Sequence, residues 1–444
     1  MNLNSKYIQY YPFIIFFILL LVIHFILPSI EDDLIYSSFL NQNPDISSYI
    51  NNYYLPHIHG WSSRYFTDLL TPIMATYTVI WNVIDSVLFT LMALLIPKLL
   101  VKNFNDFDLK NKNKFNIIAI IITVLFGISN YCALRSAGYV ATTLNYTWPF
   151  IFGIINIYLV KTYIFDKKRL DGLKKWICYL AIIFSLAFAV NIEICAILVF
   201  GMYLYLIYEY CYRKSQYTFL KLPKSLWLLI AMIICALLFH KFNPGNDYRY
   251  HYEIANWVGN YSEVTLINKI DLATTSLYAM MLTTVDLILF VFFGLLGIYS
   301  YKINKKKSSL IVFIPAIILI LAYIKLGFDG FNALSLAQNF APNGLISHGL
   351  DLKVILIIIS YIVMILTVLY GLYIINKHGN SKIMPLLIWI IILAFVSQSV
   401  VGFAPSAQIW YFPLHKYPGR WWLLFNGMIS FASAILIYEI LKRK

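Results

Sequence analysis

About twelve apolar runs, separated by polar segments, constrain the fold of this 444-residue sequence more than any other feature. A bilayer core is about 30 Å thick and an α-helix rises about 1.5 Å per residue, so one crossing needs about 20 mostly apolar residues. The sequence is 61% hydrophobic and 12% charged, too apolar for a soluble globular protein of this length. We therefore expect an all-α, polytopic integral membrane protein. The approximate runs are 10–28, 73–97, 115–130, 146–163, 176–190, 194–210, 226–240, 278–299, 309–326, 352–375, 383–403 and 421–440.

The positions of Lys and Arg predict the orientation of these spans, because cytoplasmic loops retain basic residues. With the N-terminus inside, all but nine of the 34 Lys and Arg fall in inner segments. The stretch 176–210 has basic segments on both sides, so it must cross twice and turn near residues 191–193, which places Glu193 toward the outer face. Both termini are expected to be cytoplasmic, and the richness in Ile, Asn and Lys favours a bacterial plasma membrane. The nine outer basic residues are Arg64, Arg135, Lys241, Arg249, Lys269, Lys325, Lys353, Lys416 and Arg420.

The predicted outer loops are longer than the inner ones, which limits where chemistry can occur. Large outer segments include about 29–72 and 241–277, whereas the longest inner loop, about 98–114, is too short for a nucleotide-binding fold. Neither G-x-x-x-x-G-K-[ST] nor G-x-G-x-x-G occurs. The net charge of +14 comes mainly from inner loops and does not indicate a nucleic-acid partner. We expect one transmembrane domain over 1–444, with no separate soluble domain, that acts at its outer face on an already activated substrate.

Three adjacent carboxylates, Glu31, Asp32 and Asp33, directly follow the first apolar run. Crowded carboxylates repel one another, which raises at least one pKa and leaves a group able to accept a proton. The same residues could instead be a solvated loop start, or acids favourably placed at the N-terminus of the next helix. The sequence leaves these interpretations open.

A second polar element lies before the second span. Trp61, Tyr65 and Leu69 recur at i, i+4 and i+8, which predicts a helix lying in the membrane interface. Arg64 and Asp68 fall on a neighbouring face, where Arg64 could bind a phosphate or form an i,i+4 ion pair with Asp68. His57 and His59 could bind a metal, although their spacing does not place them on one helix face.

In architecture the chain resembles the GT-C superfamily of multi-pass glycosyltransferases, which take sugars from polyprenyl-phosphate carriers. The resemblance rests on the acidic pair Asp32 and Asp33 opening a large first outer loop, on the segment "GWSSRYF" and on many spans with short inner loops. It is strongest to bacterial O-antigen glucosyltransferase-like members and to a related family with an acidic pair followed by a Trp and Arg element. In motif it covers only 29–72 and the late "YPGRWW". Here "SSR" stands where related sequences have Gly before Arg, and no large C-terminal outer domain follows the last span.

The resemblance implies a reaction and a set of site residues. A sugar would pass from a polyprenyl-phosphate donor to a glycan, lipid or protein acceptor of the cell envelope, and some relatives need a divalent metal ion. Asp32 would act as the general base on the acceptor hydroxyl, with Asp33 and Glu31 as its electrostatic or metal-binding neighbours. A phosphate leaving group at headgroup depth needs cations there. The expected substrate contacts are Glu31, Trp61, Arg64, Arg249, Lys416 and Arg420.

Polar residues inside the predicted spans leave a second function open, that of a secondary transporter or a flippase for a lipid-linked saccharide. Thr78, Asn82 and Asp85 share one helix face, and Asp286 falls in the eighth run. Such groups are costly in hydrocarbon, so we expect them to face inward and to hydrogen-bond between helices. A non-catalytic scaffold is the third class, but it gives no reason for the acidic trio. The five cysteines show no C-x-x-C pair and are interpreted as packing residues.

Overall fold

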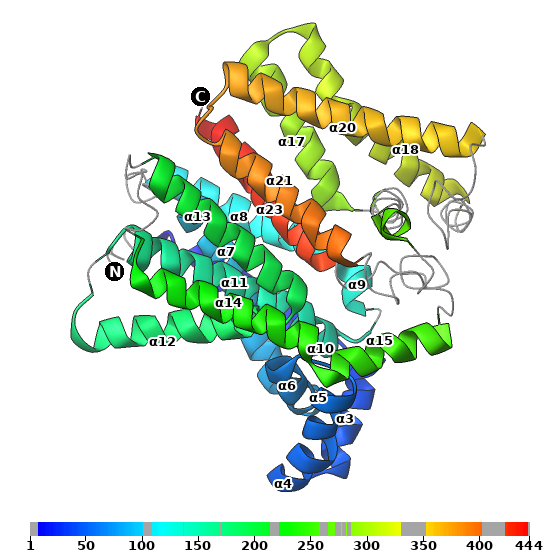
Figure 1. Cartoon of the computed structure of the whole chain (residues 1–444). Helices are drawn as coiled ribbons and strands as arrows, with labels where there is room; N and C mark the ends of the chain where they lie inside the picture. The colour runs from blue at the N-terminus through cyan, green and yellow to red at the C-terminus, as the bar shows by residue number, and fades with distance from the viewer. Residues whose placement is uncertain are drawn as a thin grey trace. The chain divides into compact units, whose positions relative to one another are not determined.

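The computed structural model describes most of the chain. The described residues are 8–100, 109–135, 137–168, 170–213, 222–257, 265–270, 277, 281, 286–329, 352–401 and 422–442. Within these ranges the chain is helical and contains no strand (Figure 1). The expected all-α class is therefore confirmed.

Ten of the helical segments are long and apolar enough to cross a membrane, which is compatible with a polytopic membrane protein. Each falls on one of the runs expected from the sequence. The other two expected crossings are shorter apolar helices, Tyr11–Ile26 and Met384–Ser399. The ten segments are Thr78–Leu100, Lys112–Ser129, Tyr139–Phe165, Gly172–Ala189, Glu193–Tyr212, Lys224–Phe242, Leu287–Asn304, Lys307–Ile324, Ile358–His378 and Trp422–Lys442.

The chain folds as two compact units. The first contains residues 1–123 and 134–249, and the second contains 124–133 and 250–444. All of the described residues of the candidate site belong to the first unit, so the fold of that unit decides the geometry of the site.

The first unit begins with α2 (Tyr11–Ile26) and then folds the predicted outer loop 29–72 almost entirely into short helices. The prediction of one interfacial helix running through Trp61, Tyr65 and Leu69 is wrong, because the helix is interrupted from Trp61 to Arg64. The short helices are α3 (Asp32–Gln42), α4 (Ile46–Ser48), the π-helix η1 (Tyr49–Tyr54), α5 (Leu55–Gly60) and α6 (Tyr65–Thr76).

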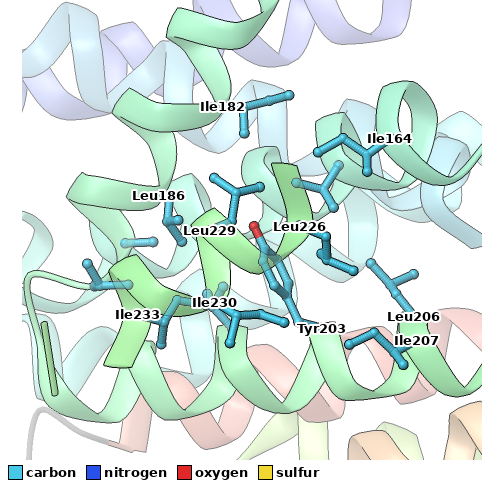
Figure 2. Close-up of a cluster of buried hydrophobic side chains, with 14 of the residues drawn as sticks. Ile164, Ile182, Leu186, Tyr203, Leu206, Ile207, Leu226, Leu229, Ile230 and Ile233 are labelled. Atoms are coloured by element: carbon cyan, nitrogen blue, oxygen red, sulfur yellow. The ribbon is translucent and has the colours of Figure 1, made fainter. Parts of the chain in front are cut away.

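The long helices of the first unit follow, and they pack around a shared apolar core. In Figure 2 the side chains of Ile182, Leu186, Tyr203 and Leu226 point toward one another from three helices. The hydroxyl of Tyr203 donates to Oδ1 of Asn156 (2.5 Å), and the amide of Asn156 donates to the carbonyl of Ile182 (2.8 Å). The helices are α7 (Thr78–Leu100), α8 (Leu109–Ser129), α9 (Tyr131–Arg135), α10 (Tyr139–Thr142), η3 (Thr143–Thr147), α11 (Trp148–Leu159), η4 (Val160–Phe165), α12 (Gly172–Ala189), α13 (Glu193–Arg213), α14 (Lys224–Phe242) and α15 (Pro244–Trp257).

In the first unit, helix ends that are predicted to lie on the same side of the membrane contact one another. The expected turn between two short spans is confirmed, because α12 ends at Ala189 and α13 begins at Glu193. Asn191 in this turn accepts the N–H of Phe66 (2.8 Å), and the carbonyl of Val190 lies 2.8 Å from Nε2 of His240. At the ends with basic loops, Lys161 donates to the carbonyl of Leu99 (2.8 Å). The first loop thus lies at the ends that do not carry the basic segments.

The second unit is held by polar contacts around α23, which is its most deeply buried helix. Asp286 caps α17 by accepting the N–H of Leu289 (3.0 Å), and its other oxygen accepts the indole N–H of Trp422 (2.7 Å). Asp286 therefore has a structural role at a helix end. The described helices are α17 (Leu287–Asn304), η7 (Lys307–Phe313), α18 (Ile314–Asp329), α20 (Leu352–His378), α21 (Met384–Val401) and α23 (Trp422–Lys442).

The polar face of α7 points inward, as expected from the sequence. Asn82 and Asp85 are buried, and Asp85 joins three helices. Its Oδ1 accepts the indole N–H of Trp148 on α11 (2.7 Å), and its Oδ2 lies 3.0 Å from Nε2 of His24 on α2. The interpretation of this face as interhelical hydrogen bonding is confirmed.

This network gives a prediction about stability. Asp85→Leu leaves the Trp148 N–H and the His24 imidazole buried without their partner, so we expect a loss of about 3–5 kcal/mol in the free energy of unfolding. Asp85→Asn keeps an acceptor for Trp148 and should lose less. Unfolding of the purified protein in detergent micelles, followed by circular dichroism, measures both. Val83→Ala, on the exposed face of the same helix, is the matched control, and an equal loss in all three variants would contradict the prediction.

Candidate functional site

The acidic trio divides into three different environments at the start of α3. Asp33 is completely buried, Asp32 is half-buried, and Glu31 is exposed with a left-handed φ of 48°. Successive residues of a helix point about 100° apart, so neighbouring acids cannot all face the same group. Asp32 lies one turn before Tyr36 on the same helix, and Tyr36 is close enough to Arg64 to act on its charge. Asp32 and Tyr36 therefore share one face of α3, whereas Asp33 faces the helix that begins at Tyr139.

Asp33 caps the helix that begins at Tyr139. Its Oδ1 accepts the backbone N–H of Ala141 (2.9 Å), and the N–H groups of Tyr139 and Val140 also bond this carboxyl. Gly138 precedes this helix with a φ of 92°, and a Cβ there would overlap the Asp33 carboxyl. A side chain at Gly138 is therefore excluded by space as well as by backbone conformation.

Burial raises the pKa of Asp33 to about 6, against the opposing effect of the backbone N–H groups that favour its charged form. The sequence predicts a raised carboxyl pKa in the trio, and Asp33 has one. Its cause is burial of Asp33 and not the predicted repulsion between neighbouring carboxylates. The proposed catalytic role of Asp33 is also weakened, because the side chain is committed to a helix end and has no exposed surface.

The helix interruption from Trp61 to Arg64 organises the second polar element. Trp61 ends α5, and Arg64 is the residue that precedes α6. Ser62 accepts the N–H of Arg64 (3.2 Å), and the hydroxyl of Ser63 lies 2.6 Å from Nδ1 of His240. Serine side chains that bond nearby backbone compete with helical hydrogen bonds, which explains why the apolar periodicity is not followed here.

Arg64 lies over an aromatic ring in the interior of the first unit. Its guanidinium carbon is 5.4 Å from the centroid of Tyr146, and Nη2 donates to the Tyr146 hydroxyl (3.4 Å). Although burial opposes the charge of Arg64, the neighbouring Tyr146, Glu193 and Asp68 raise its pKa above the ordinary arginine value. The guanidinium therefore stays cationic and close to two carboxylates.

The Arg64 to Asp68 ion pair, one of the two alternatives that the sequence leaves open, is not among the ion pairs of the described residues, and Asp68 faces His57 instead. Oδ2 of Asp68 lies 3.6 Å from Nε2 of His57, and the Asp68 side chain is only 3% exposed. Asp68 lies in the first turn of α6, where its negative charge is favourable. The sequence analysis considers His57 only as a possible metal ligand. Because the helix is interrupted between His57 and Asp68, helical spacing does not predict that the two side chains face each other.

Glu193, His240 and Asn246 complete this part of the site from the next helices. Nδ1 of His240 lies 3.9 Å from Oε1 of Glu193, and the Asn246 amide donates to the same oxygen (3.2 Å) and to the Ser63 hydroxyl (2.8 Å). The sequence does not decide whether Glu193 is a carboxylate of the site or a residue of the turn. Through Asn246 it is linked to Ser63 in the segment 61–64.

Arg249 reaches the site from α15, as expected for a residue of the predicted loop 241–277. Its guanidinium carbon is 5.5 Å from the centroid of Trp61, a cation–π distance. Gly245 makes this approach possible, because a Cβ there would overlap the Ile58 carbonyl and the Ser62 nitrogen. Trp61, Arg64 and Arg249, three of the expected substrate contacts, are thus part of one group. We call this group the polar cluster: His57, Trp61, Arg64, Asp68, Tyr146, Glu193, His240, Asn246 and Arg249.

Two expected phosphate contacts, Lys416 and Arg420, lie outside the described residues, as do most of the predicted loops around them. Within the ranges that the structure describes, no group of three or more His, Cys, Asp or Glu is placed to hold a metal ion. His59 points away from His57, because its Nδ1 lies 2.7 Å from the carbonyl of Leu55 on its own helix and the residue is exposed.

Burial of Asp33 gives a pH-dependent prediction. Its pKa is raised from 3.8 to about 6 by folding, so the stability associated with the protonated form is complete below pH 3.8 and is lost as the pH rises through 6. The difference corresponds to about 3 kcal/mol at most. Asp33→Asn should therefore remove this dependence, so that the unfolding temperature changes less between pH 4 and 7 than in the wild type. Asp45→Asn, at an exposed position, is the control, and equal pH profiles for the wild type and Asp33→Asn would contradict the prediction.

Comparison with known proteins identifies no relative: no family model, no curated protein and no solved structure matches the sequence.

Proposed function

We propose that this chain transfers a sugar from a polyprenyl-phosphate-linked donor to an acceptor hydroxyl of a cell-envelope glycan, lipid or protein at the outer face of the membrane. The observation that supports this best is the polar cluster. It combines two arginines with carboxylates, imidazoles and aromatic rings at the helix ends away from the basic loops. Few other ligands would require all of these groups at the border of an apolar bundle.

The arginines fit the leaving group of such a reaction. When the bond between the sugar and the phosphate breaks, negative charge grows on a phosphate oxygen, and a fixed cation near it lowers the barrier. Arg64 directly precedes α6, whereas Arg249 lies on α15. Each guanidinium lies over an aromatic ring, that of Tyr146 for Arg64 and that of Trp61 for Arg249. Guanidinium groups bind phosphate oxygens in pairs, which fixes the orientation of the group as well as its charge.

The remaining groups fit a sugar and its acceptor. Binding sites for small molecules combine apolar and aromatic walls with a few polar groups that fix orientation. Trp61 and Tyr146 supply rings, whereas Glu193 and Asn246 supply an acceptor and a donor for hydroxyl groups. A base is also needed, and the resemblance to GT-C enzymes assigns that role to Asp32. The donor carries its own activation, which agrees with the absence of nucleotide-binding motifs from the sequence.

A secondary transporter or lipid-linked saccharide flippase is the second candidate. The buried pair formed by His24 and Asp85 favours it, since ionisable groups within spans often lie on proton or substrate paths. The same pair is fully engaged with Trp148 and Ser86, which a structural role also explains. Loss of function with normal folding in Asp85→Asn would favour transport over transfer.

The proposal is tested first by comparing cells with and without the chain. Mass spectrometry of cell-envelope glycans should show a sugar residue that depends on the chain. In membrane vesicles from these cells, release of polyprenyl phosphate from a panel of polyprenyl-phosphate-hexoses should require the chain as well. Unchanged glycans together with no release from any member of the panel would overturn the proposal.

Substitution of Arg64 gives a sharper prediction. Arg64→Gln removes a charge that would contact the leaving phosphate, so we expect release to fall about 10- to 100-fold, as for loss of a charge-assisted hydrogen bond. Arg64→Lys should recover only part of the rate, because a lysine cannot make the paired contact. Lys174→Gln, an exposed basic residue at the start of α12, is the matched control. Size-exclusion chromatography confirms that each variant is folded, and a normal rate in folded Arg64→Gln would exclude a role for this residue.

A further inference from the structure

His57 and Asp68 face each other across the interruption between α5 and α6. Nε2 of His57 lies 3.6 Å from Oδ2 of Asp68, and within the described part of the chain this buried oxygen has no hydrogen-bond partner. The two side chains differ in exposure, 18% for His57 and 3% for Asp68. The imidazole is therefore the more exposed member of the pair.

Aromatic stacking on one face also positions the imidazole ring of His57. It stacks on Tyr53 with 5.4 Å between the centroids and 24° between the planes, and Tyr53 in turn stacks on Phe39 and Tyr49. This column of rings comes from α3, η1 and α5. Because the ring plane is fixed and Nε2 faces Asp68, Nδ1 is the nitrogen left for another molecule.

The charges around the pair come from several elements. Burial lowers the pKa of His57, Asp68 opposes this shift, and Arg64 and Arg249 add to it. Burial likewise raises the pKa of Asp68, whereas His57 and Arg64 act in the opposite direction. The charge of Asp68 also adds to the rise that burial causes in the pKa of Tyr49, Tyr53 and Tyr54 on η1. Burial therefore favours the uncharged imidazole, which is the form that accepts a proton.

We propose that His57 is the proton acceptor of this site and that Asp68 orients its imidazole and balances the charge that forms. This inference rests on the proposed function. The acceptor hydroxyl loses its proton to Nδ1 of His57 while its oxygen bonds to the anomeric carbon of the sugar. The bond from that carbon to the phosphate oxygen breaks, and the electron pair leaves with the phosphate, which Arg64 and Arg249 stabilise. The proton on His57 passes to water after the product leaves.

Geometry favours this pair over the acidic trio as the source of the base. Asp33 is committed to the helix at Tyr139, and Glu31 is exposed. Asp32 is the alternative that the resemblance assigns. A carboxylate that holds an imidazole in one orientation is a recurring arrangement for proton transfer, because it fixes the tautomer and stabilises the imidazolium. Nε2 of His57 faces Oδ2 of Asp68 at 3.6 Å, an ion-pair separation that is longer than a hydrogen bond, and both residues belong to the polar cluster.

The first test measures coupling within the pair and needs no substrate. Hydrogen–deuterium exchange at the imidazole carbon, read by mass spectrometry of the full chain in lipid nanodiscs, gives the pKa of His57. Asp68→Asn removes the neighbouring carboxylate, so this pKa should fall by about one unit relative to the wild type. His59, which the same digest covers, is the internal reference. A pKa of His57 that does not change in folded Asp68→Asn would overturn the pairing.

The second test measures transfer as a function of pH, using polyprenyl phosphate release in the vesicle assay. In the wild type, kcat/KM should rise with pH through the pKa measured for His57 by exchange. His57→Gln should lose about 10²- to 10⁴-fold in kcat and lose this rise, as expected when a general base is removed. Asp68→Asn should shift the rise to lower pH. His59→Gln, two residues away and exposed, is the control and should behave as the wild type.

The two tests separate this inference from the proposed function. If the wild type releases polyprenyl phosphate but His57→Gln keeps its rate and pH profile while Asp32→Asn is inactive, transfer stands and the base is Asp32. If the wild type releases nothing, the proposed function fails, and the exchange measurement alone decides whether the proton-accepting pair exists. Should Asp68→Asn not fold, coincidence of the His57 pKa with the rise in wild-type activity decides the question without any variant.

Discussion

Backbone N–H and C=O groups at the end of an apolar helical bundle need hydrogen-bond partners, and this requirement determines how the first loop of the first unit packs. Asn191 satisfies it at the start of α6 by accepting the Phe66 N–H and donating to Thr67 (2.8 Å each). The hydroxyl of Thr67 donates to Asn145 (2.9 Å), so the first loop is fixed both to the turn between α12 and α13 and to η3. Buried amides and hydroxyls that are fully paired give a structure its uniqueness more than its stability. Here they hold the residues between α5 and α6 in place beside Arg64 and Asp68.

Much of the helical layout follows from the sequence alone. The apolar runs, the basic loops and the turn before Glu193 depend on local composition, and composition is what membrane crossing selects. The inward polar face of α7 could be predicted for the same reason, because an acid such as Asp85 cannot face hydrocarbon. These features can be predicted without knowing which helices pack against one another.

The arrangement of the site could be predicted only in part. Trp61, Arg64 and Arg249 were expected as substrate contacts from residue type and position, and they do come together. The interruption of the helix after Trp61 was not expected, and the contact that Ser63 makes there could not be predicted, because His240 is 177 positions away in the sequence. The roles of Asp32 and Asp33 also could not be separated, since only the packed structure shows which of two adjacent acids is buried. His57 gave a signal, a histidine in a polar turn, but nothing in the sequence connected it with Asp68.

The missing side chain of Gly245 has a mechanical consequence. The start of α15 touches the peptide groups of Ile58 and Ser62 so closely that a methyl group would not fit between them. α15 therefore cannot move closer to the segment before α6 without displacing these two peptide groups. Because Arg249 lies on α15 and His57 directly precedes Ile58, the helix that carries the cation and the segment that carries the imidazole are in close backbone contact.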